Sequence, residues 1–581
     1  MRRAKLLAGC CAAVLALSGA AAWGADVTPD RLLAAGTDAE AGNWLMVGKT
    51  FDSNRFSTLN DINASNVAGL HVITAAPLGG TEPGGFGVGA VEATPLADGG
   101  FLYVSDPWGT PYKFDVSDGK TAKLVWTCDT GVDKDPTIGL LITHRGVALA
   151  GNLVIAGLFN GHVVACDADT GDVVWDKQVA REEGEGFIAA PLVIGDKVLV
   201  GQSYGDWATR GYVAALKVDN GDELWRFYAV PEPGQPGSET WKCDEAGNAD
   251  CWKTGGGGMW VTGSYDPGTN MTYWGTGNPT PMFDPEYRPG DNLYTDATVA
   301  LDADTGELKW HFQYTPGDYH DYDEVGPQLL IDTKINNEDR KVLAHFGRNG
   351  FFYDLDRTNG AYIQSGQYVG KLTWTKGIDP KTGMPLEYDP TKSLQVYASG
   401  AINRAGATAT TCPNLQGGTN FFPTGYNPTL GLAYAVGIEG CSDIATKTVA
   451  PADVHGGQIF QGGIGTNNGV QTGTISAVDV ATGKMTAQQP TQFPMYSGVM
   501  ATPDLLWAGS LDGTFAAYDA KTLEVKWSMN VGTSFQASPI AFTAGGKEYI
   551  AVVGGGPGLA TFGHPELEGR ATANVLWVFG L

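Results

Sequence analysis

The chain has 581 residues, of which 63 are acidic and 37 basic, giving a formal net charge of −26. This negative charge argues against nucleic acid and anionic membrane surfaces as partners, and it would attract a basic soluble protein. The 82 glycines, 16 tryptophans and 22 tyrosines, with only 17% charged residues, are typical of many short strands joined by tight turns.

Residues 1–25 have the pattern of a secretory signal peptide. A basic start (Arg2 to Lys5) precedes an apolar run from Leu6 to Ala22, and small residues close the segment. A lipoprotein box ending at Cys10 is disfavoured because the apolar run continues well past that cysteine. No later apolar stretch is long enough to span a membrane, so we expect no membrane span and, in a Gram-negative host, a periplasmic protein.

Six cysteines remain beyond residue 25, as suits an oxidising compartment. Cys243 and Cys251 bracket a short loop and can close one bridge, while Cys412 and Cys441 flank a glycine-rich insertion and can close a longer one. Cys128 and Cys166 can pair or remain buried thiols. No CxxCH sequence occurs, so no c-type haem is attached.

An internal repeat predicts the fold. The template is an apolar strand, a turn through Thr-Gly or its substitute, and a closing tryptophan, and its clearest copies are Val163 to Trp175, Val213 to Trp225, Thr298 to Trp310 and Phe515 to Trp527. Weaker copies end at Trp126 or lie at 351–360 and 475–483. The turn joins antiparallel strands, and the tryptophan can staple one sheet to the next.

Repeats about 40 to 50 residues apart indicate propeller blades. Seven copies are present, and Asn43-Trp44 with Val575 to Gly580 would complete an eighth by closing the ring with both ends of the chain. We therefore predict an all-β, eight-bladed β-propeller with tryptophan-docking repeats as one domain over residues 26–581. A propeller alone does not define a function.

The stretch from Phe312 to Asp323 (FQYTPGDYHDYD) carries the strongest chemical signal. Asp318, Asp321 and Asp323 lie within six residues beside a Pro-Gly turn, where the carboxylates would repel one another unless a cation offset their charge. Oxygen ligands from several loops suit calcium-like ions. The alternative is an acidic surface loop.

Over about 60 residues this part of the chain resembles the quinoprotein alcohol dehydrogenases, enzymes that use pyrroloquinoline quinone (PQQ). The matching motifs are SYDP at 264–267, YWGTGNPTP at 273–281, RPGDNLYT at 288–295 and ALDADTGELKWHFQYTPGDYHDYD from Ala300. The resemblance extends along nearly the whole chain, and it also implies an eight-bladed propeller and the Cys412–Cys441 bridge.

The resemblance implies one metal ion held by a glutamate, an asparagine and the catalytic aspartate, together with atoms of the cofactor. The family's asparagine maps onto Asn278 and its catalytic aspartate onto Asp321, while the family's glutamate is replaced by Asp206 in GQSYGDWATRGYVAA. Asp323 matches the extra carboxylate of the lanthanide-dependent branch. A trivalent ion gains from one more anionic oxygen, so the charge count favours a lanthanide over calcium, unless Asp323 is a solvated turn residue.

Family positions that touch PQQ map onto Glu92, Arg145, Ser203, Gly205, Trp260, Arg348 and Asn420. Arginines can pair with the carboxylates of this flat tricarboxylate, and a tryptophan can support its ring. Asp321 is the expected base, which takes the hydroxyl proton of an alcohol, and Arg348 is expected to steady the negative charge that develops on the quinone oxygen.

Several positions depart from the family pattern. Gly139 and Leu140 stand where many members have an adjacent cysteine pair, and Gly157 and Gly258 replace two cofactor-contacting threonines. The tryptophan before the base is His320, which either binds substrate or packs in the interior.

The sequence thus predicts a periplasmic oxidoreductase that converts alcohols to aldehydes by hydride transfer to metal-activated PQQ. The metal is a lanthanide(III) or Ca²⁺, and electrons pass to a soluble cytochrome c because the chain carries no haem motif. A homodimer is possible. Two alternatives stay open: a quinoprotein that oxidises sugars or polyols, and a non-catalytic propeller scaffold.

Overall fold

The computed structural model describes residues 26–135, 137, 139–556, 558, 560, 563–568 and 573–581. The predicted signal peptide lies outside these residues. Within them no helix is both long and apolar enough to cross a membrane. The helices are short, namely α1 (Pro29–Leu33) and the 3-10 helices η1 (Asp38–Glu40), η2 (Val67–Gly69), η3 (Gly205–Trp207), η4 (Ser238–Thr240), η5 (Cys243–Ala246), η6 (Cys251–Thr254), η7 (Pro285–Tyr287) and η8 (Pro451–Asp453).

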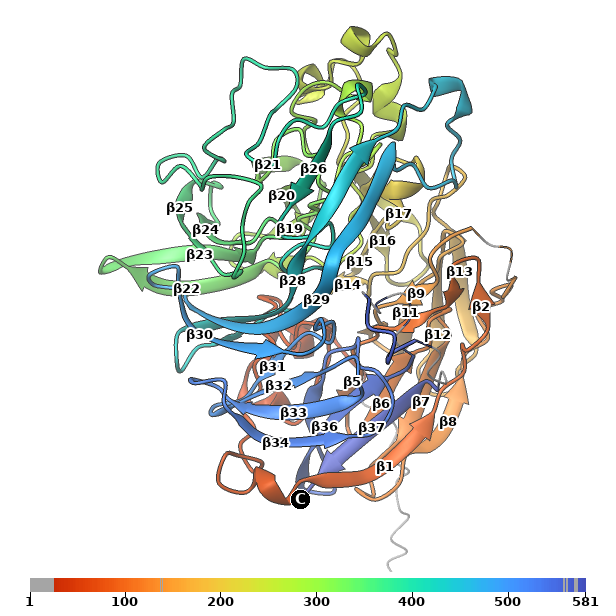
Figure 1. The fold of residues 1–581 in the computed structure, drawn as a ribbon. Coiled ribbons are helices and arrows are strands. Elements are labelled where there is room, and N and C mark those ends of the chain that lie inside the picture. Colours follow the sequence, from red (N-terminus) through yellow and green to blue (C-terminus); the bar gives the residue numbers. More distant parts are fainter. Residues whose placement is uncertain are drawn as a thin grey trace, which may run out of the picture.

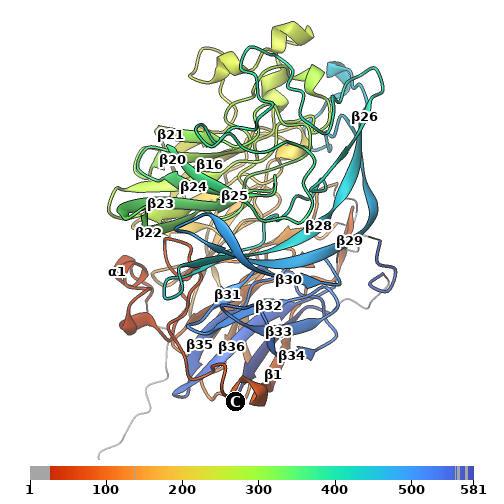
Figure 2. The ribbon, with the colours of Figure 1, turned by 60° about the vertical axis from the view of Figure 1, so that its left-hand side comes forward.

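The described strands form seven four-stranded sheets and one five-stranded sheet, all antiparallel, which follow one another around the molecule (Figures 1 and 2). The first sheet along the chain contains β5 (Leu96–Asp98), β6 (Phe101–Ser105), β7 (Pro111–Asp115) and β8 (Lys123–Thr127), and the second contains β10 (Ala148–Ala150), β11 (Leu153–Gly157), β12 (His162–Asp167) and β13 (Val173–Gln178). The third contains β14 (Leu192–Ile194), β15 (Lys197–Gly201), β16 (Tyr212–Lys217) and β17 (Glu223–Tyr228). The fourth contains β18 (Ser264–Asp266), β19 (Met271–Gly275), β20 (Ala297–Asp302) and β21 (Leu308–Gln313).

The fifth sheet contains β22 (Leu329–Ile335), β23 (Glu338–Phe346), β24 (Phe351–Asp356) and β25 (Tyr362–Gln367). The five-stranded sheet contains β26 (Thr408–Thr411), β27 (Gly425–Asn427), β28 (Leu432–Thr446), β29 (Gly463–Asp479) and β30 (Lys484–Thr491). The last two contain β31 (Met500–Ala501), β32 (Leu505–Gly509), β33 (Thr514–Asp519) and β34 (Val525–Asn530), and then β35 (Ile540–Ala544), β36 (Lys547–Gly554), β37 (Val575–Gly580) and β1 (His71–Pro77). Two small ladders join β2 (Pro83–Gly84) to β3 (Gly87–Val88) and β4 (Ala90–Val91) to β9 (Thr143–His144).

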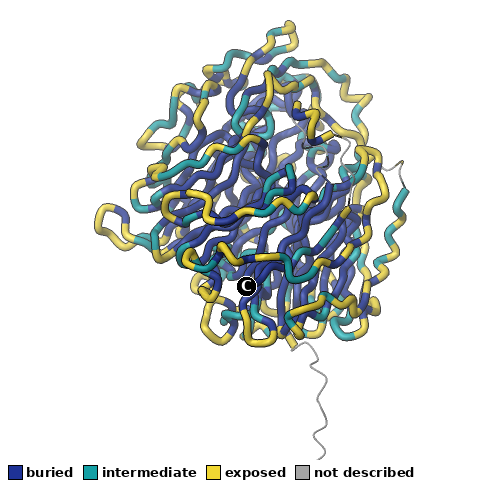
Figure 3. Tube along the Cα trace, turned by 60° about the horizontal axis from the view of Figure 1, so that its bottom comes forward, coloured by how far each residue is buried: buried dark blue, intermediate teal, exposed yellow. Residues whose placement is uncertain are grey.

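The repeat forms the turn predicted from the sequence. Asp167 accepts hydrogen bonds from the backbone N–H groups of Asp169 and Thr170, both at 2.9 Å. Gly171 follows with a φ of +80°, a left-handed conformation that glycine adopts without steric cost. β12 before the turn is largely buried, and β13 after it exposes most side chains other than the tryptophan. Figure 3 shows the general pattern, with buried segments in the interior and exposed ones mostly at the periphery.

Each closing tryptophan fastens its sheet to the next one, as predicted. Trp175 Nε1 donates to the carbonyl of Val218 at 2.9 Å, and the indole lies so close to Gly221 that a Cβ there would be 2.8 Å from the ring. The same bond runs from Trp225 to Ala303, and the indole of Trp225 covers Gly306 in the same way. The spacing between sheets is thus set by an indole packed on a glycine.

The chain ends close the ring with a partner other than the predicted one. β37 pairs with β1, so residues 71–77 supply the closing strand (Figure 1). Asn43-Trp44 was predicted for this role, and that prediction is wrong. Trp44 is fully buried and pairs through an isolated bridge with Ala97, because the segment around it crosses the ring instead of extending a sheet.

All six cysteines beyond residue 25 are paired. The disulfides join Cys128 to Cys166, Cys243 to Cys251 and Cys412 to Cys441. The first resolves the alternative that the sequence left open. The other two confirm the predicted bridges.

Replacing Gly306 with alanine tests the docking of the sheets. The new Cβ would lie 2.4 Å from Trp225, in a backbone with a φ of +71°. Gly546→Ala is the matched control, because it has a φ of +77° and nothing within 4 Å of the Cβ. We expect both variants to lose about 1 kcal/mol from the left-handed backbone, and Gly306→Ala to lose a further 1 to 3 kcal/mol, roughly, from overpacking. Equal unfolding midpoints in urea for the two variants would contradict this account.

Candidate functional site

A cavity of about 280 Å³ opens where loops from several sheets meet. Its walls contain the predicted residues Glu92, Arg145, Ser203, Asp206, Trp260, Asp321, Asp323, Arg348 and Asn420. Four carboxylates and two guanidinium groups face it, so its charged walls carry a net negative charge that favours a bound cation.

Asp321 has the geometry expected of a reactive group. Its φ is +70°, an uncommon conformation for a non-glycine residue, and it is 7% exposed. Its Oδ1 has no hydrogen-bond partner in the described part of the chain. Burial raises the pKa of Asp321 well above its usual range, Arg348 opposes that shift, and the charges of Asp323 and Asp206 add to it. The carboxylate is therefore held in a strained and poorly solvated position.

Arg348, in the turn after β23, is the cation that faces these carboxylates. Its guanidinium bonds to Asp323, lies 3.4 Å from Asp321 Oδ2 and donates to the carbonyl of Leu415 at 2.9 Å. Its backbone N–H donates to Glu324 Oε2 at 3.0 Å, and His345 holds the same oxygen at 2.8 Å. The backbone and the guanidinium of Arg348 are therefore both fixed.

Asp323 is not a solvated turn residue, since it is 3% exposed. One of its oxygens bonds to Arg348, and the other accepts from Trp260 Nε1 at 2.8 Å. Burial raises the pKa of Asp323, while Arg348 and the Trp260 hydrogen bond lower it. The alternative of an acidic surface loop also fails for Asp318, which is fully buried.

Asp206 and Asn278 complete the predicted metal set. Asp206 lies in η3 and Asn278 follows β19, and Asn278 lies close enough to Asp206 to lower its pKa. Burial and the charge of Asp323 raise the pKa of Asp206 to about 7, although Arg348 and Asn278 lower it. Asn278 is 2% exposed and lies beneath the cavity wall, with its Nδ2 donating to the carbonyl of Pro279 at 3.2 Å.

The donor set suits a hard cation in its chemistry. The charge of Asp323 raises the pKa of Asp206, and the charges of Asp323 and Asp206 raise that of Asp321. Asp321 Oδ1 has no hydrogen-bond partner in the described residues, so a cation would relieve the repulsion. The described residues contain no group of three or more His, Cys, Asp or Glu side chains already gathered around one point. A bound ion would therefore draw the carboxylates together or take further ligands from the cofactor.

Arg145 forms the floor of the cavity. It pairs with Glu92 at 2.8 Å, and its guanidinium lies 4.8 Å from the centroid of the Trp260 ring and 4.3 Å from that of Phe421. Stacking of a planar guanidinium on aromatic faces is favourable in a desolvated site. Burial raises the pKa of Glu92, and the charge of Arg145 opposes the shift.

Of the other predicted cofactor positions, Ser203 and Asn420 line the cavity and Gly205 does not. Ser203 Oγ accepts from the N–H of Ile188 at 3.1 Å, and Asn420 Nδ2 donates to the carbonyl of Gln416 at 3.0 Å. A Cβ on Gly205 would lie 2.7 Å from the backbone N of Gly258. Glycine at position 205 thus lets two backbone segments approach closely.

One departure from the family pattern has a steric cause, and at another the segment is held by hydrogen bonds. A Cβ on Gly157 would lie 2.7 Å from the Cβ of Phe187, so this site has no room for threonine. Near Gly139, where the cysteine pair is missing, aromatic side chains hold the segment, because Trp207 Nε1 donates to the Gly139 carbonyl at 2.8 Å and the Tyr204 hydroxyl to that of Leu141 at 2.9 Å.

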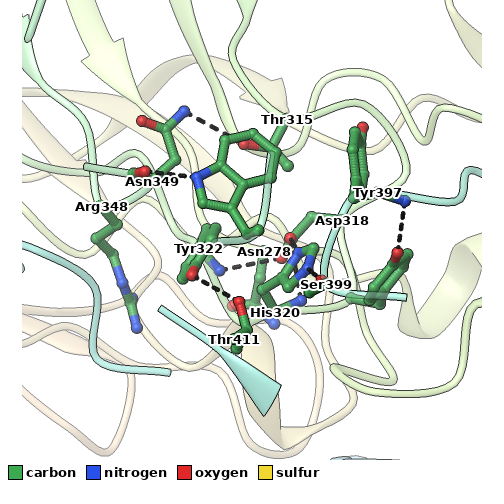
Figure 4. A network of polar contacts seen from close by, with 12 residues as sticks. Asn278, Thr315, Asp318, His320, Tyr322, Arg348, Asn349, Tyr397, Ser399 and Thr411 are labelled. Carbon is green, nitrogen blue, oxygen red and sulfur yellow. Dashed lines mark hydrogen bonds and ion pairs between the residues drawn. The ribbon is translucent and has the colours of Figure 1, made fainter. Parts of the chain in front are cut away.

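His320 packs in the interior and does not line the cavity. Its Nδ1 lies 2.8 Å from Asp318 Oδ1 and its Nε2 lies 3.2 Å from Ser399 Oγ (Figure 4). The ring stacks on Tyr322, with centroids 4.9 Å apart. Of the two roles that the sequence allowed, packing is the one that the contacts support.

Sequence reasoning missed several wall residues, namely Tyr204, Trp207, Gln416, Phe421, Tyr496 and Gln536. Phe421 directly follows the predicted Asn420, which was a usable signal. It also missed Asp296, which is fully buried at a φ of +48° and has neither carboxylate oxygen bonded within the described residues. No sequence motif distinguishes Asp296 from the turn aspartates of the repeats.

Comparisons with known proteins identify the family. The profile described as "Glucose/ethanol/alcohol dehydrogenase, beta-propeller domain", a PQQ family, matches residues 44–365. The chain is 33% identical over 559 residues to the quinoprotein alcohol dehydrogenase PedH of Pseudomonas putida, covering 92% of this chain and 90% of that protein. It is 30% identical to the lanthanide-dependent methanol dehydrogenase of Methylacidiphilum fumariolicum, covering 90% of this chain and 87% of that protein.

A solved structure titled "Europium-containing methanol dehydrogenase" superposes with a TM-score of 0.84 at 27% identity, covering 95% of this chain and all of that one. The chain therefore belongs to the PQQ-dependent alcohol dehydrogenases. Its fold is the mostly-β propeller of that family, as predicted from the repeats.

The raised pKa of Asp206 predicts a pH-dependent effect of Asp206→Asn on the metal-free protein. The pKa of about 7 in the folded chain exceeds the value of about 3.9 in an unfolded chain, so ionisation of Asp206 removes stability as the pH rises through that window. Asparagine cannot ionise. The unfolding temperature of the variant minus that of the wild type should be more positive at pH 8 than at pH 4. A difference independent of pH would refute the raised pKa of Asp206.

Proposed function

We propose that this protein oxidises small alcohols to aldehydes with PQQ and one bound metal ion. The observation that carries the proposal is the buried Asp321 carboxylate, which is strained, has one oxygen without a bonding partner in the described residues and shares a cavity with Arg348, Trp260 and Arg145. A scaffold protein would have no use for such a group, because burying it costs stability.

Asp321 is the proposed base. Its Oδ1, which has no bonding partner in the described residues, would take the hydroxyl proton of the alcohol, while its Oδ2 lies 3.4 Å from Arg348. PQQ, when bound, would supply the acceptor for the hydride of the carbinol carbon. The guanidinium of Arg348 directs one N–H group toward Asp323 and another toward Asp321, and it would stabilise negative charge on the quinone oxygen.

The cofactor would lie over the Arg145–Glu92 floor and against Trp260. Arg145 can pair with a carboxylate of PQQ, while the indole of Trp260 offers a flat apolar surface whose orientation is fixed by Asp323. Ser203, Gly205 and Asn420 would border the ring system. Asp206, Asn278, Asp321 and Asp323 are the proposed metal ligands, and the metal would act as a Lewis acid.

We propose that the seven four-stranded sheets and the five-stranded sheet are the eight blades of one domain over residues 26–581. A signal peptide at 1–25 would export the protein to the periplasm, and electrons would pass to a cytochrome c. Support comes from one relative, the methanol dehydrogenase [cytochrome c] subunit 1 of Methylorubrum extorquens, which is 31% identical to the chain.

Asp321→Asn tests the catalytic assignment. We expect dye-linked alcohol oxidation by the PQQ- and metal-loaded enzyme to fall by about 10²- to 10⁴-fold, because amide replaces the base. Asp219→Asn, at an exposed turn, should keep full activity. Activity of Asp321→Asn within a few-fold of the wild type, with PQQ still bound by its absorbance, would exclude Asp321 as the base.

The metal preference depends on Asp323. Wild-type apoprotein reconstituted with PQQ should be active with a light lanthanide and weak with calcium, because three anionic oxygens at one site favour a trivalent ion. Asp323→Asn should reduce the difference in activity between the lanthanide and calcium forms, because it should weaken lanthanide binding more than calcium binding. Titration calorimetry measures both affinities. If the wild type is active with calcium alone, Asp323 is not a metal ligand and serves only to hold Arg348 and Trp260 in place.

A further inference from the structure

A segment near the start of the described chain, residues 42–57, crosses the centre of the ring. Backbone N–H groups in six different sheets donate to its carbonyls, namely Thr543 to Gly42 at 2.9 Å, Ala97 to Trp44 at 2.9 Å, Tyr265 to Phe51 at 2.9 Å, Leu330 to Asp52 at 3.1 Å, Tyr426 to Asn54 at 2.7 Å and Ala501 to Arg55 at 3.0 Å. A single segment can reach all six only by running across the ring. We call residues 42–57 the crossing segment.

A second cavity, of about 50 Å³, separates the crossing segment from the floor of the candidate active site. Glu92, Arg145 and Phe421 line both cavities and form the partition between them. The volume exceeds the 10 to 15 Å³, roughly, that one water molecule requires, but it is too small for an organic substrate. Its charged lining residues are Arg55, Glu92 and Arg145, and the rest of the wall is neutral.

Arg55 is a buried cation without a counter-charge. It is 1% exposed, and its φ of +50° turns the backbone at the crossing segment. The guanidinium donates to the carbonyls of Val499 at 2.9 Å, Pro539 at 3.0 Å and Val47. No carboxylate of the described residues forms an ion pair with it, and burial alone lowers its pKa to about 9, so it stays charged near neutrality.

The balance of charge around the small cavity is positive. Glu92 is already paired with Arg145 at 2.8 Å, which leaves the charge of Arg55 uncompensated. Three of its five N–H groups have carbonyl partners in the described residues, and carbonyl dipoles do not neutralise a full charge. An isolated ion in an apolar interior is costly unless an opposite charge comes close.

We propose that the small cavity binds a halide-sized monovalent anion, in the cell chloride, against the guanidinium of Arg55. The anion occupies a space that the crossing segment closes from one side and the Glu92–Arg145–Phe421 partition closes from the other. It supplies the missing counter-charge without entering the active-site cavity. The site is separate from the proposed cofactor and metal positions.

Anomalous diffraction from crystals grown with bromide in place of chloride tests this site directly. We expect a bromide peak inside the ring, within hydrogen-bonding distance of the Arg55 guanidinium. Bromide peaks confined to the protein surface would indicate an adventitious ion only and would overturn the proposal. Water density beside Arg55 in the bromide crystal would overturn it as well.

Thermal unfolding of the full protein in chloride or gluconate, at equal ionic strength, provides a second measure. Because the anion binds the folded state alone, the unfolding temperature should rise by about 1 to 3 °C for each tenfold increase in chloride above its Kd. Arg55→Met should lose this dependence, while Arg340→Met, at an exposed ion pair with Glu338, should keep it. Equal unfolding temperatures of the wild type in the two salts would overturn the proposal even if Arg55→Met fails to fold.

Discussion

Three carboxylates of the active-site cavity, Asp206, Asp321 and Asp323, depend on one cation, Arg348. Like charges in a poorly solvated site repel, and their pKa values rise until a positive group or a metal ion compensates them. Arg348 bonds to Asp323 and lies 3.4 Å from Asp321, while the Glu324–His345 pair anchors the backbone N–H of Arg348. Without this guanidinium the site would hold uncompensated charge, so its position constrains every other polar group in the cavity.

The ring of sheets brings these groups together from distant parts of the sequence. Asp206 follows β15, Asn278 follows β19, and Asp321 and Asp323 follow β21. These loops lie in or directly beneath the cavity wall, and the sheets that carry them are fastened to one another by tryptophans packed on glycines, as at Trp175 and Gly221. The regular repeat therefore fixes the positions of an irregular set of side chains.

The sequence predicted what is periodic or locally encoded. The turns after Asp167 and its equivalents repeat, so the strands, the docking tryptophans and the cavity residues in motifs could be placed. The role of Asn43-Trp44 could not, because a strand that closes a sheet and a segment that crosses the ring have the same local composition. The left-handed backbone of Asp321 and the packing of His320 against Asp318 also depend on tertiary contacts that no single stretch encodes.

The partition made by Glu92, Arg145 and Phe421 separates two regions of opposite charge imbalance. On one side, four carboxylates face two guanidinium groups, which leaves the cavity negative and suited to a metal cation. On the other side, Arg55 has no carboxylate partner, which leaves the small cavity positive. Glu92 and Arg145 neutralise each other at 2.8 Å, so the partition itself carries little net charge. Because the two imbalances lie on opposite sides of a neutral layer, each can be satisfied by its own ion, and neither requires the side chains of the other cavity to move.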